Sequence, residues 1–79
     1  MSDDLSHLPR ELDNRTSAGI QVSLWWSRAD GRTWVAVRDA HTGDAFVLPV
    51  LAGERACDVF DHPYAYAARR GVRTTGRAA

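Results

Sequence analysis

Residues 20–50 read IQVSLWWSRADGRTWVAVRDAHTGDAFVLPV, and this stretch decides the fold. It contains three runs in which β-branched and aromatic side chains dominate, at residues 20–27, 33–38 and 45–50. In the first run, Ile20, Val22 and Leu24 alternate with other residues, and this period of two is typical of a β-strand with two different faces. The stretch therefore predicts three strands.

Two turns join the runs and set the pairing of the predicted strands. Asp30-Gly31 marks the first turn and Thr42-Gly43 marks the second, because glycine accepts positive φ at little cost. Counting outward from a four-residue loop at each turn aligns the runs as antiparallel neighbours. The predicted pairs are Trp26–Thr33, Trp25–Trp34, Leu24–Val35, Val22–Val37, Val37–Phe46, Val35–Leu48 and Thr33–Val50.

The two registers agree on one apolar face, although separate turns set them. A slip of one residue in either hairpin would scatter the apolar side chains over both faces. The agreement therefore predicts a three-stranded antiparallel β-meander with one core face. That face comprises Ile20, Val22, Leu24, Trp26, Val35, Val37, Phe46, Leu48 and Val50.

The opposite face is mixed, but two tryptophans and a proline lie side by side on it. Large aromatic side chains that are exposed together usually mark an interface. The sequence leaves open whether the N-terminal segment, a second copy of the chain or another protein covers them. The predicted interface residues are Trp25, Trp34, Ala36, Val47 and Pro49.

The chain after the meander predicts two short helices. Residues 54–60 carry an apolar stripe that would pack on the core face of the sheet. Pro63 ends this helix at His62 and suits the first position of a second helix, which Gly71 would end. Residues 72–79 are expected to be a disordered tail.

The chain before the meander predicts less structure. Residues 1–7 are expected to be disordered. A short helix could begin at Pro9 and run to Asp13, followed by a loop over residues 14–19. The predicted fold is therefore one α+β domain over residues 8–71, a three-stranded meander with two C-terminal helices on one face and this short N-terminal helix.

Composition bounds the function. The 79 residues include ten arginines, no lysine and ten acidic residues, so the net charge is zero. A neutral chain lacks the excess of positive charge that is typical of nucleic-acid-binding proteins. The sequence has no apolar run that could span a membrane, and its acidic start lacks signal-peptide features, so we expect a cytoplasmic protein. The single Cys57 excludes an intramolecular disulfide, and its apolar flanks predict a buried side chain.

Candidate chemistry is sparse. His62 beside Asp58 and Asp61 could act as a base or bind a metal, but these residue types are also ordinary at a helix junction, and we favour a structural role. His7 and His41 have no matched ligand spacing. No nucleophile motif or phosphate-binding loop is present, and a short chain has little room for a substrate pocket. We therefore predict no catalytic residue, no cofactor and no metal.

A second contact surface lies on the last helix and the basic end of the chain. Tyr64 and Tyr66 are two residues apart on a helix, so only one of them can face the sheet. Arg73 and Arg77 extend the basic charge into the tail, which suggests an alternative function in RNA or ribosome binding. The residues of this surface are His62, Tyr64, Tyr66, Arg69 and Arg70.

One pattern resembles a known group. A Gly-Ile strand opening, a strand ending in Trp, a Thr-Gly turn and Phe60 before His62-Pro63-Tyr64-Ala65-Tyr66 resemble a set of small proteins of high-GC bacteria. The likeness covers roughly residues 12–70, and it implies no catalytic residues because that group has no known activity. The predicted helix–three strands–helix order is also similar to double-stranded-RNA-binding domains, but the Lys-rich start of their last helix is missing.

These observations together favour a non-enzymatic interaction protein that self-associates, with a homodimer through the Trp25/Trp34/Pro49 face as the leading hypothesis. A different, unidentified protein partner is an open alternative on the same surface. Nucleic-acid binding through the Arg-rich tail ranks second, and an enzyme using His62 and Asp58 ranks third.

Overall fold

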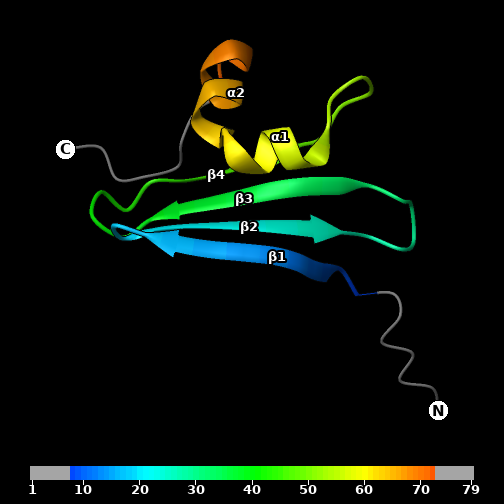
Figure 1. Cartoon of the computed structure of the whole chain (residues 1–79), viewed down its shortest axis with the longest axis horizontal. Helices are drawn as coiled ribbons and strands as arrows, with labels where there is room; N and C mark the ends of the chain where they lie inside the picture. Colours follow the sequence, from blue (N-terminus) through cyan, green and yellow to red (C-terminus); the bar gives the residue numbers. More distant parts are fainter. Residues whose placement is uncertain (1–7, 73–79) are drawn as a thin grey trace.

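The computed structural model describes residues 8–72, which form a four-stranded antiparallel sheet with two helices on one face (Figure 1). The strands lie in sequence order, so each pairs with its neighbour along the chain. This confirms the α+β class. Of the segments expected to be disordered, residues 1–7 and 73–79 lie outside the described residues. Val72, the first residue of the predicted tail, instead donates its amide to the carbonyl of Ala67 at 2.9 Å and packs against the core. The elements are β1 (Arg10–Ser17), β2 (Ile20–Trp26), β3 (Thr33–Asp39), β4 (Ala45–Pro49), α1 (Ala56–Asp61) and α2 (Pro63–Arg70).

The predicted register is confirmed in both hairpins of the meander. Trp25 pairs with Trp34, which in turn pairs with Pro49, and the apolar ladders of the core face align as expected. The amide of Ser27 donates to the carbonyl of Arg32 at 2.8 Å, which closes the first turn where the four-residue loop predicted it.

The prediction for the N-terminal segment was wrong. Residues 10–17 form the strand β1 instead of a short helix and a loop, so the sheet has four strands, not three. A helix there would have only Leu8 and Leu12 to bury, and both are more than half exposed. As a strand, the segment satisfies the outer backbone groups of β2. The element order therefore no longer matches that of double-stranded-RNA-binding domains.

A two-residue turn makes this extra strand fold back onto β2. Ala18 and Gly19 have φ values of 52° and 81°, and two successive residues at positive φ give the turn that suits the twist of a hairpin. A side chain at Gly19 would lie 2.5 Å from Nε2 of His41, so both the backbone and the neighbouring turn favour glycine.

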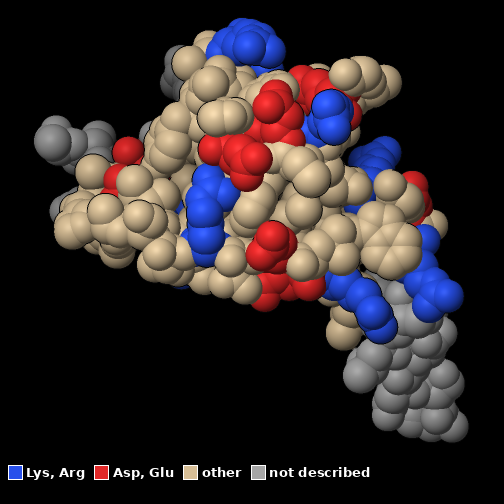
Figure 2. Space-filling model, in the orientation of Figure 1, with Lys and Arg blue, Asp and Glu red and all other residues tan. Residues whose placement is uncertain are grey.

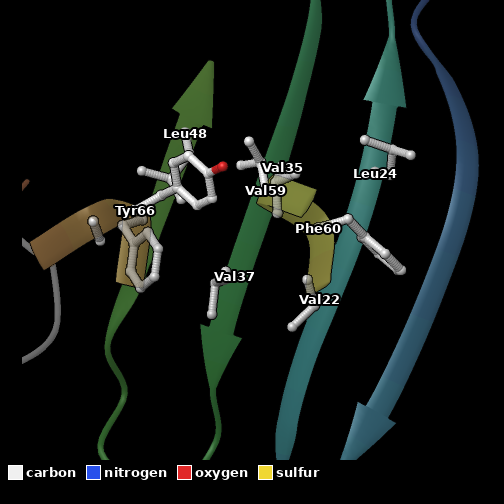
Figure 3. Close-up of a cluster of buried hydrophobic side chains, with 10 residues drawn as sticks. Val22, Leu24, Val35, Val37, Leu48, Val59, Phe60 and Tyr66 are labelled. Atoms are coloured by element: carbon white, nitrogen blue, oxygen red, sulfur yellow. The ribbon is translucent and has the colours of Figure 1, made fainter. Parts of the chain in front are cut away.

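The core lies between the sheet and the helices (Figure 3). Val35, Leu48 and Val59 have no exposed surface, and α1 and α2 cover β2 to β4. The predicted core face and the apolar stripe of α1 are thus confirmed. Trp26, at the end of β2, is only partly buried. The buried apolar side chains are Val22, Leu24, Val35, Val37, Phe46, Leu48, Val59, Phe60, Tyr66 and Ala67.

The helices begin and end near their predicted boundaries. Pro63 is the first residue of α2, and Gly71 ends it with a φ of 68°. Cys57, which we expected to be buried, is exposed. It lies about 100° around α1 from Ala56, and the helix turns Ala56, not Cys57, toward the sheet.

Candidate functional site

The face of the sheet opposite α1 and α2 brings the five predicted interface residues together. Trp25, Trp34 and Pro49 follow one another in a single cross-strand ladder, and Ala36 and Val47 are neighbours in the next. β1 adds polar side chains at one margin. From β1 to β4, the three ladders are Glu11–Trp25–Trp34–Pro49, Asn14–Ser23–Ala36–Val47 and Thr16–Gln21–Arg38–Ala45.

A groove of about 620 Å³ lies over the part of this face around Trp25, Ala36 and Val47 and extends to Val37, Phe46 and Val72. Its floor is low because small side chains, Ser23 and Ala36, lie at its centre, whereas Trp25 and Arg38 are among the larger side chains that line it. The indole Nε1 of Trp25 donates to Oγ of Ser23 at 2.9 Å, which fixes the ring and covers the hydroxyl. The groove is larger than the short chain led us to expect.

Several apolar side chains on this face remain open to solvent within residues 8–72. Val47 is 55% exposed, Pro49 is exposed, and both tryptophans are only partly buried. Residues 10–17 lie beside β2 as a strand and do not cross the face, while residues 1–7 lie outside the described part of the chain. We name the side chains of Trp25, Trp34, Ala36, Val47 and Pro49 the open face.

The second predicted surface divides into a buried part and an exposed part. Tyr66 is 8% exposed and Tyr64 is 44% exposed, so one tyrosine faces the core and the other does not, as predicted. The rings of Tyr64 and Phe46 pack in a T-shaped arrangement, with the centroids 5.3 Å apart. Arg69 is exposed and lies 4.9 Å from the centre of the Tyr66 ring.

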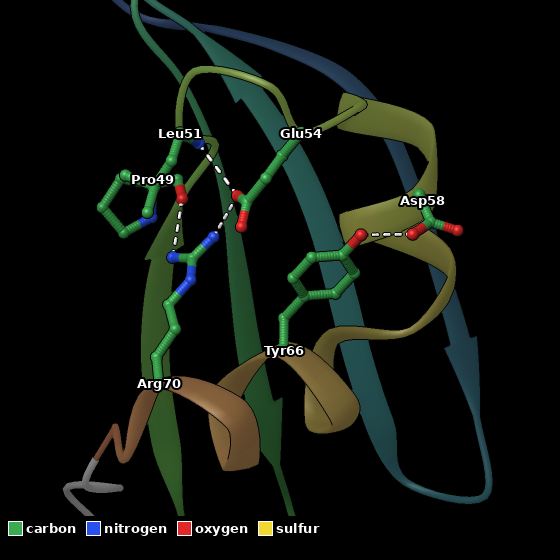
Figure 4. Close-up of polar contacts among 6 residues, drawn as sticks. All are labelled: Pro49, Leu51, Glu54, Asp58, Tyr66 and Arg70. Carbon is green, nitrogen blue, oxygen red and sulfur yellow. Dashed lines mark hydrogen bonds and ion pairs between the residues drawn. The ribbon is translucent and has the colours of Figure 1, made fainter.

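Arg70 belongs to a structural network between α2 and the loop after β4 (Figure 4). Its Nη1 donates to the carbonyl of Pro49 at 2.8 Å, and its Nη2 forms an ion pair with Glu54. Glu54 also accepts the amide of Leu51 at 2.9 Å. The guanidinium is therefore occupied within the chain, which reduces what it can offer to a phosphate.

Asp58 and His62, the candidate acid–base residues, both make hydrogen bonds at the helix junction. The carboxylate of Asp58 accepts the hydroxyl of Tyr66, and His62 takes part in the helix junction through its backbone, whose amide donates to the carbonyl of Asp58 at 2.9 Å. Within residues 8–72, no three His, Cys, Asp or Glu side chains gather where they could ligate a metal ion.

Tyr66 predicts a pH dependence of stability. Its hydrogen bond to Asp58 raises the pKa of the phenol above its ordinary value of 10.0. A group whose pKa is higher in the folded state stabilises the fold below its unfolded pKa, and this contribution disappears as pH rises through the folded pKa. We expect the melting temperature of the wild type to fall above about pH 10. The difference in melting temperature between the wild type and Tyr66→Phe should become smaller in the same pH range.

Thermal unfolding followed by circular dichroism from neutral to alkaline pH measures this difference. Tyr64→Phe is the comparison variant, because it keeps the Tyr66–Asp58 bond and measures separately the pH dependence that comes from Tyr64, whose pKa is raised by desolvation and by Asp39 and Asp44. An advantage of the wild type over Tyr66→Phe that stays constant across this range would contradict the assignment.

Figure 2 shows Arg side chains interspersed with Asp and Glu over the visible face, without a patch of a single sign. Neither helix within residues 8–72 has the length and apolar composition that crossing a membrane requires.

Comparison with known proteins adds no further constraint on the site. No family model, curated protein sequence or solved structure matches this chain. The candidate site therefore rests on the residues and contacts described above.

Proposed function

We propose that the protein is a non-enzymatic interaction protein that forms a homodimer by packing the open faces of two copies against each other. The observation that carries this proposal is the ladder Trp25–Trp34–Pro49 on a sheet face that no helix of residues 8–72 covers. A small domain buries a limited fraction of its surface, so covering a second apolar face adds stability that the single chain lacks.

The edges of the sheet are less suited to pairing than its open face. β1 has a bulge between Glu11 and Asp13, and the Asp13 carboxylate accepts the amide of Asn14 at 2.8 Å. On β4, Pro49 has no amide hydrogen and its carbonyl already accepts Arg70. Bulges, charges and prolines hinder the addition of another strand at an edge. Association through the face is therefore favoured over association through an edge.

A two-fold axis parallel to the strands gives a complementary arrangement. It runs between the two sheets, over the boundary of β2 and β3, and places Trp25 of one copy over Trp34 of the other. The same operation places Arg38 over Gln21, so no like charges oppose each other at that position. Aligned packing of this kind is the common arrangement of two antiparallel sheets, and offset tryptophan rings add to its energy.

The size of the face sets the expected affinity. Four strands about 4.8 Å apart and about seven residues long outline roughly 450 Å² per copy. Two such faces total about 900 Å², an area typical of weak and transient interfaces, so we expect a dissociation constant on the order of 10 µM. The dimer would therefore exchange with monomers at ordinary cellular concentrations.

Val47→Asp tests the proposal by placing a charge on the open face. Val47 is 55% exposed in the single chain, so the substitution should leave the fold intact and weaken the dimer at least about 30-fold, because two buried carboxylates would lose water. Sedimentation velocity from roughly 1 to 300 µM, on either side of the expected dissociation constant, measures the change.

Cys57→Asp is the matched control. It introduces the same charge at an exposed position on α1, in the layer that covers the opposite side of the sheet, and it should leave the dissociation constant unchanged. A wild-type chain that sediments as a monomer over the whole concentration range would refute the proposed dimer, as would equal effects of the two substitutions.

The two other functions have less support. For RNA binding through the tail, Arg70 is engaged with Glu54, and Arg73 and Arg77 lie outside the described residues. Catalysis by His62 and Asp58 has less support because the Asp58 carboxylate already accepts a hydrogen bond from the Tyr66 hydroxyl.

A further inference from the structure

A second cavity lies on the helix side of the sheet, away from the open face. It measures about 460 Å³ and occupies the step between the β1–β2 hairpin and the junction of α1 and α2. Ile20 and Val22 contribute apolar surface from the sheet, and Pro63 contributes it from the start of α2. Its volume lies within the range of small-molecule sites.

Arg15 is held beside this cleft in a fixed position. It pairs with Val22 in the register of the sheet, which directs its side chain to the helix side. The guanidinium carbon lies 4.6 Å from the centre of the Phe60 ring, and Nη2 donates to the carbonyl of Asp61 at 3.4 Å. Its other N–H groups make no hydrogen bond to residues 8–72, so most of the fork is available to a ligand.

We propose that this cleft binds a small organic monocarboxylate, whose apolar body lies on Ile20 and Val22 and whose carboxylate accepts hydrogen bonds from Arg15. A guanidinium matches the planar geometry of a carboxylate with two parallel donors, and a preset arginine loses little entropy when it binds. His62 also lines the cleft and has no side-chain hydrogen bond as the N-cap of α2, so its ring can supply a further donor.

The charges around the cleft select a single negative charge. Asp61 lines it as well, so the fixed positive charge of Arg15 is opposed by one carboxylate. A dianion such as a phosphate monoester would meet that repulsion with only one permanent cation to offset it. A neutral or cationic ligand would leave the Arg15 donors unused. An amphiphilic monoanion satisfies both the apolar surface and the arginine.

A free carboxylic acid and the C-terminus of a peptide share this chemistry. Hexanoate represents the first source and N-acetylleucine represents the second. Hexan-1-ol and N-acetylleucinamide keep the apolar body of each probe and remove the negative charge, so each pair isolates the contribution of the carboxylate.

Titration of the full chain, followed by ¹H–¹⁵N correlation spectra, tests the assignment. We expect saturable shifts at the amides of Arg15, Ala18 and Ala65 with at least one carboxylate, and at least about tenfold weaker binding of its neutral counterpart. Binding of N-acetylleucine alone would identify a peptide C-terminus, and binding of hexanoate alone would identify a free acid.

Arg15→Gln should weaken carboxylate binding at least about tenfold, and Arg15→Lys should weaken it less, because lysine keeps the charge and loses the fork. Arg32→Gln removes an exposed arginine in the β2–β3 turn and should change nothing. The proposal is overturned if neither carboxylate gives saturable shifts at the cleft, or if the neutral probes bind equally well. These two outcomes require no variant, so they hold even where Arg15→Gln fails to fold.

Discussion

Replacing both Trp25 and Trp34 with serine should convert the protein into a monomer at every practical concentration. The two rings form the centre of the open face, and central aromatic side chains carry most of the energy of an interface. Hot-spot losses are not additive, so we count a total loss of about 4 kcal/mol for the dimer and expect the dissociation constant to rise at least about 1,000-fold. Sedimentation velocity and intrinsic tryptophan fluorescence against concentration measure this change.

Thermal stability at low concentration distinguishes an interface from an internal core. At about 1 µM, where the wild type is expected to be monomeric, the serine variant should melt close to the wild type. A large loss of melting temperature there would mean that the tryptophans stabilise the single chain, which is the alternative left open by the sequence. Trp26→Ser is the matched control, because Trp26 lies on the helix side of the sheet and its loss should leave dimerisation unchanged.

Arg70→Met should destabilise the fold by about 2–3 kcal/mol, because the carboxylate of Glu54 loses its cation and keeps only the amide of Leu51, and the carbonyl of Pro49 loses its side-chain donor. The side chains of Arg70 and Glu54 are 16% and 20% exposed, so the cost lies below that of a fully buried pair. For a domain of this size, the melting temperature should fall by roughly 10–20 °C. Urea unfolding followed by circular dichroism gives the free energy directly.

The neighbouring arginine provides the control for this substitution. Arg69 is exposed and contacts only the Tyr66 ring among the described residues, so Arg69→Met should cost about 0.5 kcal/mol. Combining Arg70→Met with Glu54→Gln should recover part of the loss, because the buried negative charge is then removed as well. Equal effects of the two single substitutions would contradict the role assigned to the network.

The sequence predicted the meander because its information is local. Turn residues at 30–31 and 42–43 fix the register, and alternating side chains fix the faces, so Trp25 opposite Trp34 could be read without any structure. The ends of the second helix could also be predicted from the sequence, because Pro63 and Gly71 impose backbone geometry there.

β1 was missed because its side chains carry almost no pattern. Seven of its eight residues are exposed, so neither face shows an apolar period. The one available signal was Ala18-Gly19 directly before an alternating run, which a hairpin turn would have explained. Cys57 was misplaced for a related reason, because apolar flanks do not say which side of a helix faces the core.

The amino-acid sequence by itself thus determined the strand register, the two faces of the sheet and the ends of the second helix, because neighbouring residues set turn and helix geometry. Only the tertiary structure decided that β1 completes the sheet, that Arg70 binds Glu54, and that Arg15 stands beside a cleft at the helix junction. The contacts of Arg70 and Arg15 join residues 16 and 46 positions apart, and β1, although it lies in a hairpin, has no apolar period of its own. The contacts of Arg70 and Arg15 form only when the sheet and the helices pack together, so no local sequence pattern predicts them.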